Sequence, residues 1–244
     1  MSYLERYANG DHEGVWLELG ALHESELDAA ALSDVEAVTL ETIQRVKRNL
    51  ASIAAELEAM GFVFGEFNDD GTGFYGDDPI LRAHPMVALE DARRLMTELS
   101  SVVNGPVPLV YRVFAEQIGE VDFRGTHPRF KSEFLLDALM VDFFVPRRDE
   151  VEEWLEQLAD VPELAKFQHS FAPDDFHKQN VSGGSPYSYQ LPDDRIDPPV
   201  LGTPIDGSFT AYLRDSILTH ACFPGFADIP ADLLEHLRQG LVRF

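Results

Sequence analysis

The stretch KFQHSFAPDDFHKQNVSGGSPYSYQLP, residues 166–192, carries the main evidence for the fold class. Its two ends, KFQHSFAP and YSYQLP, are rich in aromatic residues and predict two β-strands. The segment between them contains Pro173 and the pair Gly183–Gly184, residues that suit a chain doubling back on itself. Two strands joined by such a turn run antiparallel, so this stretch predicts part of an antiparallel sheet.

Strands and helices alternate irregularly on both sides of this stretch. Strands are expected in EVDFRG (120–125) and LMVDFFVP (139–146), and a helix in VPLVYRVFAEQIG (107–119), with Gly119 ending it. Further helices are expected behind the caps Asp149 and Ser208 and in IPADLLEHLRQG (229–240). This order does not follow a repeated βαβ pattern. It predicts an α+β fold with a mainly antiparallel sheet packed by helices.

The N-terminal part predicts mostly helix. A capping box at Ser33–Glu36 precedes a long amphipathic helix that ends at Gly61. The apolar stripe of this helix consists of Leu40, Ile43, Val46, Leu50, Ile53, Leu57 and Met60. Residues 1–32 show only weak periodicity and predict a loosely packed lead-in.

Two more elements are expected before residue 104. The stretches GFVFGEF, NDDG and TGFYGD (61–77) predict a short β-hairpin around an Asp-Gly turn. A second helix is expected over Ala88–Val103. The resulting organisation is an N-terminal helical extension with a short β-hairpin over residues 1–100 and an α+β domain over residues 101–244. No repeat or linker marks the boundary, so one continuous domain is the alternative.

Charge is the strongest global property of the chain. Its 244 residues include 43 Asp and Glu against 19 Lys and Arg, a net charge of −24 and a pI of about 4.5. Such a surface repels nucleic acid and anionic membranes, so neither is expected as a partner. It favours a basic protein partner guided by electrostatic attraction, or alternatively a charge kept for solubility or a salty cytoplasm.

The sequence contains none of the common targeting or catalytic motifs. The chain has no apolar run of about 20 residues and no apolar segment typical of a signal peptide near Met1, so a cytoplasmic protein is expected. It lacks the Walker phosphate loop, the G-x-G-x-x-G, H-E-x-x-H and G-x-S-x-G motifs. The single cysteine, Cys222, excludes an internal disulfide and is expected to be buried. No cofactor is predicted.

The turn at residues 172–187 contains the densest group of polar side chains. His169, Asp174, Asp175 and His177 are residue types that bind metals, but helical and extended spacing each align at most two of them, so no metal site is predicted. Acid–base chemistry by Asp175 and His177 would also need a nucleophile, and Ser182 before Gly-Gly is typical of a turn. No catalytic residue is assigned. The candidate binding residues are Asp175, His177, Lys178, Asn180, Ser182 and Tyr187, with His127 and Arg214 as accessories.

A structural interpretation explains the same residues. Asp174 and Asp175 after Pro173 can accept backbone N–H groups at the start of a helical turn, and Asn180 can bond backbone groups in turns. Residues 172–187 can therefore be interpreted in two ways, as a turn held by side chain-to-backbone hydrogen bonds or as a binding site.

Three segments resemble the SUKH superfamily. GPVPLVYRVFAEQIGEVDFRG (105–125) is similar to its opening signature, in which Pro108, Tyr111, Phe114, Gly119 and Phe123 fall on the matching positions. PDDFHKQNVSGGSPY (173–187) and FTAYLRDSILTHACFPGF (209–226) are similar to related bacterial proteins, so the resemblance covers about residues 100–226. It implies a non-enzymatic α+β binding module. Many bacterial members are immunity proteins that neutralise toxin domains, often basic nucleases, and fungal relatives act in cell-wall assembly and signalling.

The sequence therefore leaves two alternative functions open. The favoured one is a non-enzymatic acidic protein-binding module, with an immunity protein against a basic toxin domain as the particular case. The alternative is an enzyme or small-ligand-binding protein with its site around Asp175, His177, Lys178 and Asn180.

Overall fold

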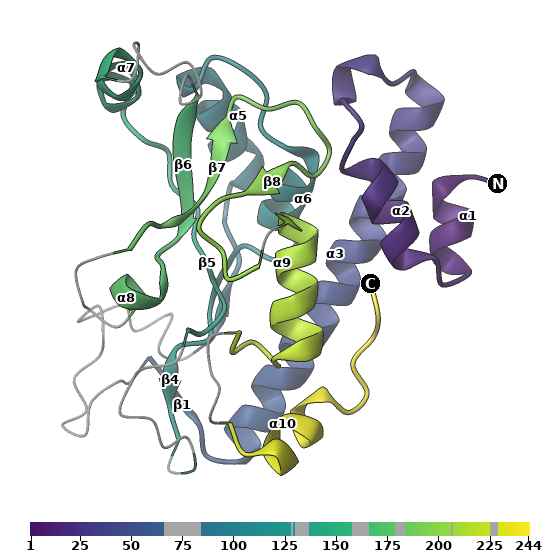
Figure 1. The fold of residues 1–244 in the computed structure, drawn as a ribbon, viewed down its shortest axis with the longest axis vertical. Coiled ribbons are helices and arrows are strands. Elements are labelled where there is room, and N and C mark those ends of the chain that lie inside the picture. The colour runs from purple at the N-terminus through teal and green to yellow at the C-terminus, as the bar shows by residue number, and fades with distance from the viewer. Residues whose placement is uncertain are drawn as a thin grey trace.

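The computed structural model describes residues 1–65, 84–127, 129, 137–157, 166–178, 184–205, 207–224 and 229–244. These residues form an α+β fold, as the sequence predicted, with the strands on one side of the molecule and the long helix α3 on the other (Figure 1). Within these ranges no helix combines the length and apolar character needed to cross a membrane.

Helix α3 (Ala29–Ala59) begins five residues before the predicted start, because Asp28 and not Ser33 is its N-cap. The carboxylate of Asp28 accepts hydrogen bonds from the backbone N–H groups of Ala30 and Ala31, at 3.0 and 2.9 Å, and so satisfies the first turn. Ser33 consequently lies inside the helix and does not cap it. The predicted apolar stripe is buried from Ile43 to Leu57, whereas Leu40 is 38% exposed.

Residues 1–32 are well packed, so the prediction of a loose lead-in was wrong. They form α1 (Tyr3–Ala8), α2 (His12–Leu19) and the short η1 (Glu24–Glu26). Tyr7 and Trp16 are buried, and the Trp16 Nε1–H donates to Thr42 Oγ1 on α3 at 3.0 Å. Helices this short contain too few turns for their apolar residues to repeat, which is why the sequence pattern missed them.

The strands are short and antiparallel. β2 (Met86–Val87), β3 (Glu120–Asp122) and β5 (Met140–Val141) form one ladder, and β6 (Phe167–Ala172) pairs with β7 (Tyr187–Leu191), which confirms the predicted antiparallel pair. The backbone N–H of Asp142 donates to Phe171 O at 2.7 Å, so the two ladders adjoin.

The other strands extend or flank this arrangement. A bridge between Ser188 and Leu201 connects β7 to β8 (Pro199–Val200), which pairs with β9 (Gly207–Ser208). β1 (Val63–Phe64) pairs with β4 (Gly125–Thr126), while residues 66–77 of the predicted hairpin lie outside the described residues. The strand predicted over 139–146 is confined to β5.

The remaining helices follow the predicted ones closely. They are α5 (Ala92–Val102), α6 (Leu109–Gln117), α7 (Arg148–Gln157), α8 (Asp175–Lys178), α9 (Phe209–Arg214) continued by the π-helical η3 (Asp215–Thr219), and α10 (Ala231–Arg238). Ser208 caps α9 as predicted, accepting from Ala211 N at 3.4 Å. α5 starts four residues later than predicted because Asp91 caps it, and α7 starts one residue before Asp149.

An aromatic cluster fills the core between the sheet and the helices. The Tyr111 ring on α6 lies 4.6 Å from that of Phe143 and 5.0 Å from that of Tyr189, and Phe171 lies 5.3 Å from Phe209, measured between ring centroids. Cys222 is buried, as predicted. α3 packs against α6 and α10, so residues from both sides of position 100 share this core.

Candidate functional site

Two of the predicted binding residues meet inside the molecule. Lys178, the last residue of α8, is fully buried and forms an ion pair with Asp137, which is 3% exposed. The hydroxyl of Tyr187, the first residue of β7, donates to the other oxygen of Asp137 at 2.9 Å. The Lys178 Nζ atom also lies 4.5 Å from the centroid of the Tyr187 ring. The three side chains form one closed group that joins α8 to β7.

Burial sets the electrostatics of this group. Loss of water lowers the pKa of Lys178, and the neighbouring carboxylate of Asp137 opposes that change. Burial raises the pKa of Tyr187 well above its usual range, and the charge of Asp137 adds to the effect. A buried cation held by a carboxylate and an aromatic face is fully engaged with its own chain, which is typical of a structural ion pair.

The other predicted site residues do not join this group. Asp175 is partly buried at the start of α8, whereas the side chain of His177 and all of Asn180 and Ser182 lie outside the described residues. His127 Nε2 lies 3.0 Å from Met60 O, and its Nδ1 accepts from Arg129 N at 3.1 Å.

The accessory Arg214 is also engaged by the backbone. It is partly buried on α9, and its Nε–H donates to Phe244 O at 2.7 Å. Among the described residues, no three His, Cys, Asp or Glu side chains are arranged to hold a metal ion.

Gly184 closes the turn against the carboxylate of Asp174, which is 3% exposed. A Cβ atom at Gly184 would lie 1.8 Å from Asp174 Oδ2, and the backbone φ of +73° is one that only glycine adopts freely. The sequence-based interpretation of a chain reversal near Gly183–Gly184 therefore has a steric basis at Gly184.

Gly184→Ala should destabilise the protein by about 1 kcal/mol more than Gly10→Ala, because it adds overpacking to backbone strain. Gly10 has a similar φ of +96° but open space around its Cβ position, so it reports the strain alone. Urea unfolding of the two variants measures the difference. Equal losses would show that Asp174 does not pack on this turn.

A second group of charged residues lies beside β3 and β5. Asp122 and Arg124 form a buried ion pair, with Arg124 Nε 2.8 Å from Asp122 Oδ1. The pKa of Asp142 is raised to about 7: burial is the main cause, the charges of Asp122 and Glu120 act in the same direction, and Arg124 opposes them. Shifted carboxyl groups often mark functional sites. None of these residues was singled out from the sequence, because Asp122, Arg124 and Asp142 lie in segments predicted only as strands.

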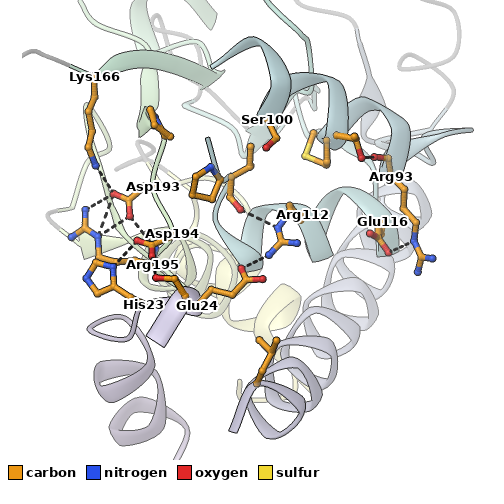
Figure 2. A pocket seen from close by; sticks show the side chains of 17 residues that line it. His23, Glu24, Arg93, Ser100, Arg112, Glu116, Lys166, Asp193, Asp194 and Arg195 are labelled. Atoms are coloured by element: carbon orange, nitrogen blue, oxygen red, sulfur yellow. Dashed lines mark hydrogen bonds and ion pairs between the residues drawn. The ribbon is translucent and has the colours of Figure 1, made fainter. Parts of the chain in front are cut away.

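A recess lies elsewhere in the described structure (Figure 2). It has a volume of about 1230 Å³ and is bounded by the segment around η1, by α5 and α6, and by the loop after β7. Its charged lining consists of Arg93, Arg112, Lys166, Arg195, Glu24, Glu116, Asp193 and Asp194, together with His23. None of these residues was a candidate from the sequence. We call this pocket the recess.

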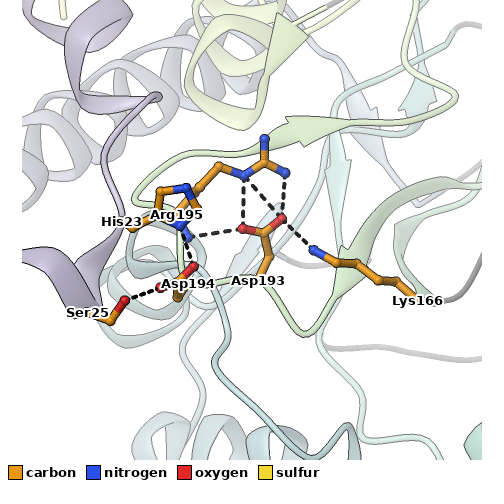
Figure 3. A network of polar contacts seen from close by, with 6 residues as sticks. All are labelled: His23, Ser25, Lys166, Asp193, Asp194 and Arg195. Atoms are coloured by element: carbon orange, nitrogen blue, oxygen red, sulfur yellow. Dashed lines mark hydrogen bonds and ion pairs between the residues drawn. The ribbon is translucent and has the colours of Figure 1, made fainter. Parts of the chain in front are cut away.

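One end of the recess is organised by Asp193 (Figure 3). This carboxylate accepts from Arg195 Nε at 3.0 Å and from Arg195 Nη2 at 2.6 Å, and Lys166 Nζ lies 3.3 Å away. Burial alone would raise the pKa of Asp193, but the hydrogen bonds from Arg195 outweigh it and the pKa is lowered. The carboxylate therefore stays ionised and holds both cations in place.

Asp194 attaches the N-terminal segment to the same loop. His23 Nδ1 lies 2.6 Å from Asp194 Oδ1, and Ser25 Oγ donates to Asp194 Oδ2 at 2.5 Å. The hydrogen bond with Asp194 raises the pKa of His23. Serine and histidine here both bond the carboxylate and not each other, so the histidine is not placed to activate the serine as in a catalytic triad.

The other charged pairs line the middle and the far end of the recess. Arg112 and Glu24 form an ion pair near its middle, and Arg112 Nε also donates to Val107 O at 3.0 Å. Arg93 Nε lies 3.0 Å from Glu116 Oε2 (Figure 2). The recess is thus framed by cations and carboxylates that already pair with one another.

Comparison of the chain with protein-family models, with curated proteins and with solved structures finds no match. The resemblance to the SUKH superfamily therefore rests on the residues quoted for it. The function is inferred below from the charge and from the placement of the side chains.

Proposed function

We propose that this protein is a non-enzymatic acidic binding module that captures a basic protein partner in the cytoplasm. The observation that carries the proposal is the charge of −24 together with its distribution. Four cations and four carboxylates line the recess, so it is close to neutral, and the whole excess of negative charge lies elsewhere. Such a charge attracts a basic partner and speeds its association.

Helix α7 is the part of the surface best suited to meet that partner. It projects at one corner of the molecule and packs through Trp154, whose ring lies 5.9 Å from that of Phe167 (Figure 1). Its sequence RDEVEEWLEQ carries five carboxylates against one arginine. The two nearest the N-terminus pair with Arg147, whereas Glu152 and Glu156 are exposed and have no cation partner within the described part of the chain. Carboxylates without partners are free to pair with a basic surface.

The placement of Lys178 and Tyr187 weighs against the alternative function, an enzyme or small-ligand site at this turn. Lys178 and Tyr187 face inward and are held by Asp137, so neither is presented to a substrate from the described surface. The resemblance to SUKH immunity proteins agrees with protein binding. In the particular case that it implies, the partner is a basic toxin domain that the acidic surface neutralises.

The test begins with identification of a partner. The tagged full chain is used to capture proteins from its own cells at low and high salt, and the captured protein is purified for binding measurements. The proposal expects a partner of positive net charge whose dissociation constant rises steeply with salt concentration. Capture of acidic proteins only, or binding that is indifferent to salt, would contradict it.

Replacing the exposed carboxylates of α7 should weaken that binding about tenfold, because several exposed ion pairs of about 0.5 kcal/mol each are lost. The test variant carries Glu152→Gln, Glu153→Gln and Glu156→Gln. The matched control carries Glu36→Gln, Glu58→Gln and Glu90→Gln, which remove the same charge from exposed positions on α3 and before α5. Surface plasmon resonance should show the loss mainly in the association rate. Equal losses in both variants would remove α7 from the proposal.

A further inference from the structure

We infer that the recess binds a small organic monoanion with an apolar body, of the class of a medium-chain carboxylate. This inference is independent of the protein partner proposed above, because the recess is bounded by η1, α5, α6 and the loop after β7, whereas the acidic helix α7 contributes no residue to it. Three properties of the recess support it: its size and apolar wall, its charge, and the unused N–H donors of its arginines.

The recess is large enough for a small molecule and has an apolar wall. Its volume of about 1230 Å³ lies slightly above the roughly 300–1,000 Å³ of ordinary ligand pockets. Between the charged groups, the wall is formed by Leu32, Met96, Pro106, Val107 and Pro192. An aliphatic chain laid along these side chains would leave water and gain the usual free energy of apolar burial.

An anion would also meet less electrostatic repulsion in the recess than the net charge of the whole chain implies. Its cations equal its carboxylates in number, whereas the whole chain carries 43 Asp and Glu against 19 Lys and Arg. The hydrogen bond with Asp194 raises the pKa of His23, which favours the charged form of the imidazole. A ligand carrying one negative charge would therefore meet a surface that is close to neutral.

Two arginines of the recess keep N–H donors that the protein does not use. A guanidinium group has five N–H donors. Arg112 uses Nε and Nη2 for Val107 and Glu24, and Arg93 uses Nε for Glu116; within the described part of the chain their other N–H groups make no hydrogen bond to protein. Asp193, in contrast, already accepts from the side chains of Arg195 and Lys166 and from the Arg195 backbone. A ligand with free acceptors would complement this arrangement.

The same groups select a monoanion over a dianion. Glu24, Glu116 and Asp194 remain close to any bound charge and would repel a doubly charged phosphate more strongly than a carboxylate. A carboxylate can accept two N–H groups from one guanidinium in a planar arrangement. Arg112, near the middle of the recess in Figure 2, is the arginine best placed to hold it while the chain lies against Met96 and Val107.

Isothermal titration calorimetry of the full chain with octanoate tests the inference, with octylammonium and acetate as comparison probes. We expect saturable binding of octanoate, at least tenfold tighter than that of either comparison probe, since octylammonium lacks the anion and acetate lacks the apolar body. No saturable binding up to about 5 mM octanoate, which corresponds to less than roughly 3 kcal/mol of binding free energy, would overturn the inference. Equal affinity for octylammonium would overturn it as well.

Two variants locate the site. Thr97→Trp places a large ring in the recess from an exposed position on α5 without removing a charge, and should abolish octanoate binding. Arg112→Met should weaken binding at least tenfold. Arg238→Met is the matched control, because Arg238 donates to Leu218 O at 2.8 Å in the way that Arg112 donates to Val107 O, but lies outside the recess. Unchanged affinity in a folded Thr97→Trp variant, or equal losses in Arg112→Met and Arg238→Met, would overturn the inference.

Discussion

Replacing Asp137 by Asn should lower the free energy of unfolding by about 3–5 kcal/mol, because it leaves the buried ammonium of Lys178 without its counter-charge. Both side chains are almost completely shielded from solvent, at 0% and 3% exposure, so water cannot replace the lost partner. Urea denaturation followed by circular dichroism at neutral pH measures the loss. The expected effect is large because a single substitution isolates a charge inside the protein.

Two further variants separate the parts of this group. Tyr187→Phe removes only the 2.9 Å hydrogen bond to Asp137 and should cost about 1 kcal/mol. The double variant Asp137→Leu, Lys178→Met removes both charges and should recover most of the loss seen with Asp137→Asn. If Asp137→Asn unfolded at nearly the same urea concentration as the wild type, the buried ion pair would not contribute as described.

Replacing Asp142 by Asn should stabilise the protein by about 2 kcal/mol at pH 8, roughly half of what a fully buried carboxyl would give, since this one keeps partial contact with water. Burial raises its pKa to about 7 in the folded state, compared with 3.8 as the ordinary value. A raised pKa means that the folded state holds the proton more tightly. Its contribution to stability is therefore present below about pH 4 and is lost as pH rises through 7.

The advantage of Asp142→Asn should thus be greatest at pH 8, shrink between pH 7 and pH 4, and vanish near pH 4. Urea denaturation of both proteins at several pH values in that range gives the difference. Glu152→Gln, on the exposed face of α7, controls for the removal of one negative charge from a protein of net charge −24. A difference that is constant with pH would contradict the raised pKa of Asp142.

Local sequence patterns predicted several elements correctly. The aromatic strands around residues 166–192 pair antiparallel, α6 and α9 lie where periodicity and capping placed them, and Cys222 is buried. The patterns failed where a helix is short, and where a residue earlier in the sequence than the predicted one caps the helix. α1 and α2 are too short to show a period, and Asp28 starts α3 ahead of the predicted Ser33.

The candidate site could be predicted only in part. Lys178 and Tyr187 border the same turn, so their proximity in the sequence indicates that they lie close together in the fold. Their common partner Asp137 lies 41 residues before Lys178, and no spacing rule connects them. Spacing rules cannot predict the recess either, because the contact between His23 and Asp194 joins residues that are 171 positions apart in the sequence.

The sequence by itself determined the α+β class, the antiparallel strand pair and the net charge of −24. These properties follow from composition and from apolar periodicity, which reports how each element buries one face. Only the tertiary structure decided that Lys178 is enclosed with Asp137 and Tyr187, and that the arginines of α5 and α6 line a neutral recess. The physical reason is that burial and ion pairing of polar side chains depend on which distant segments pack together. Neither residue type nor local spacing encodes that packing.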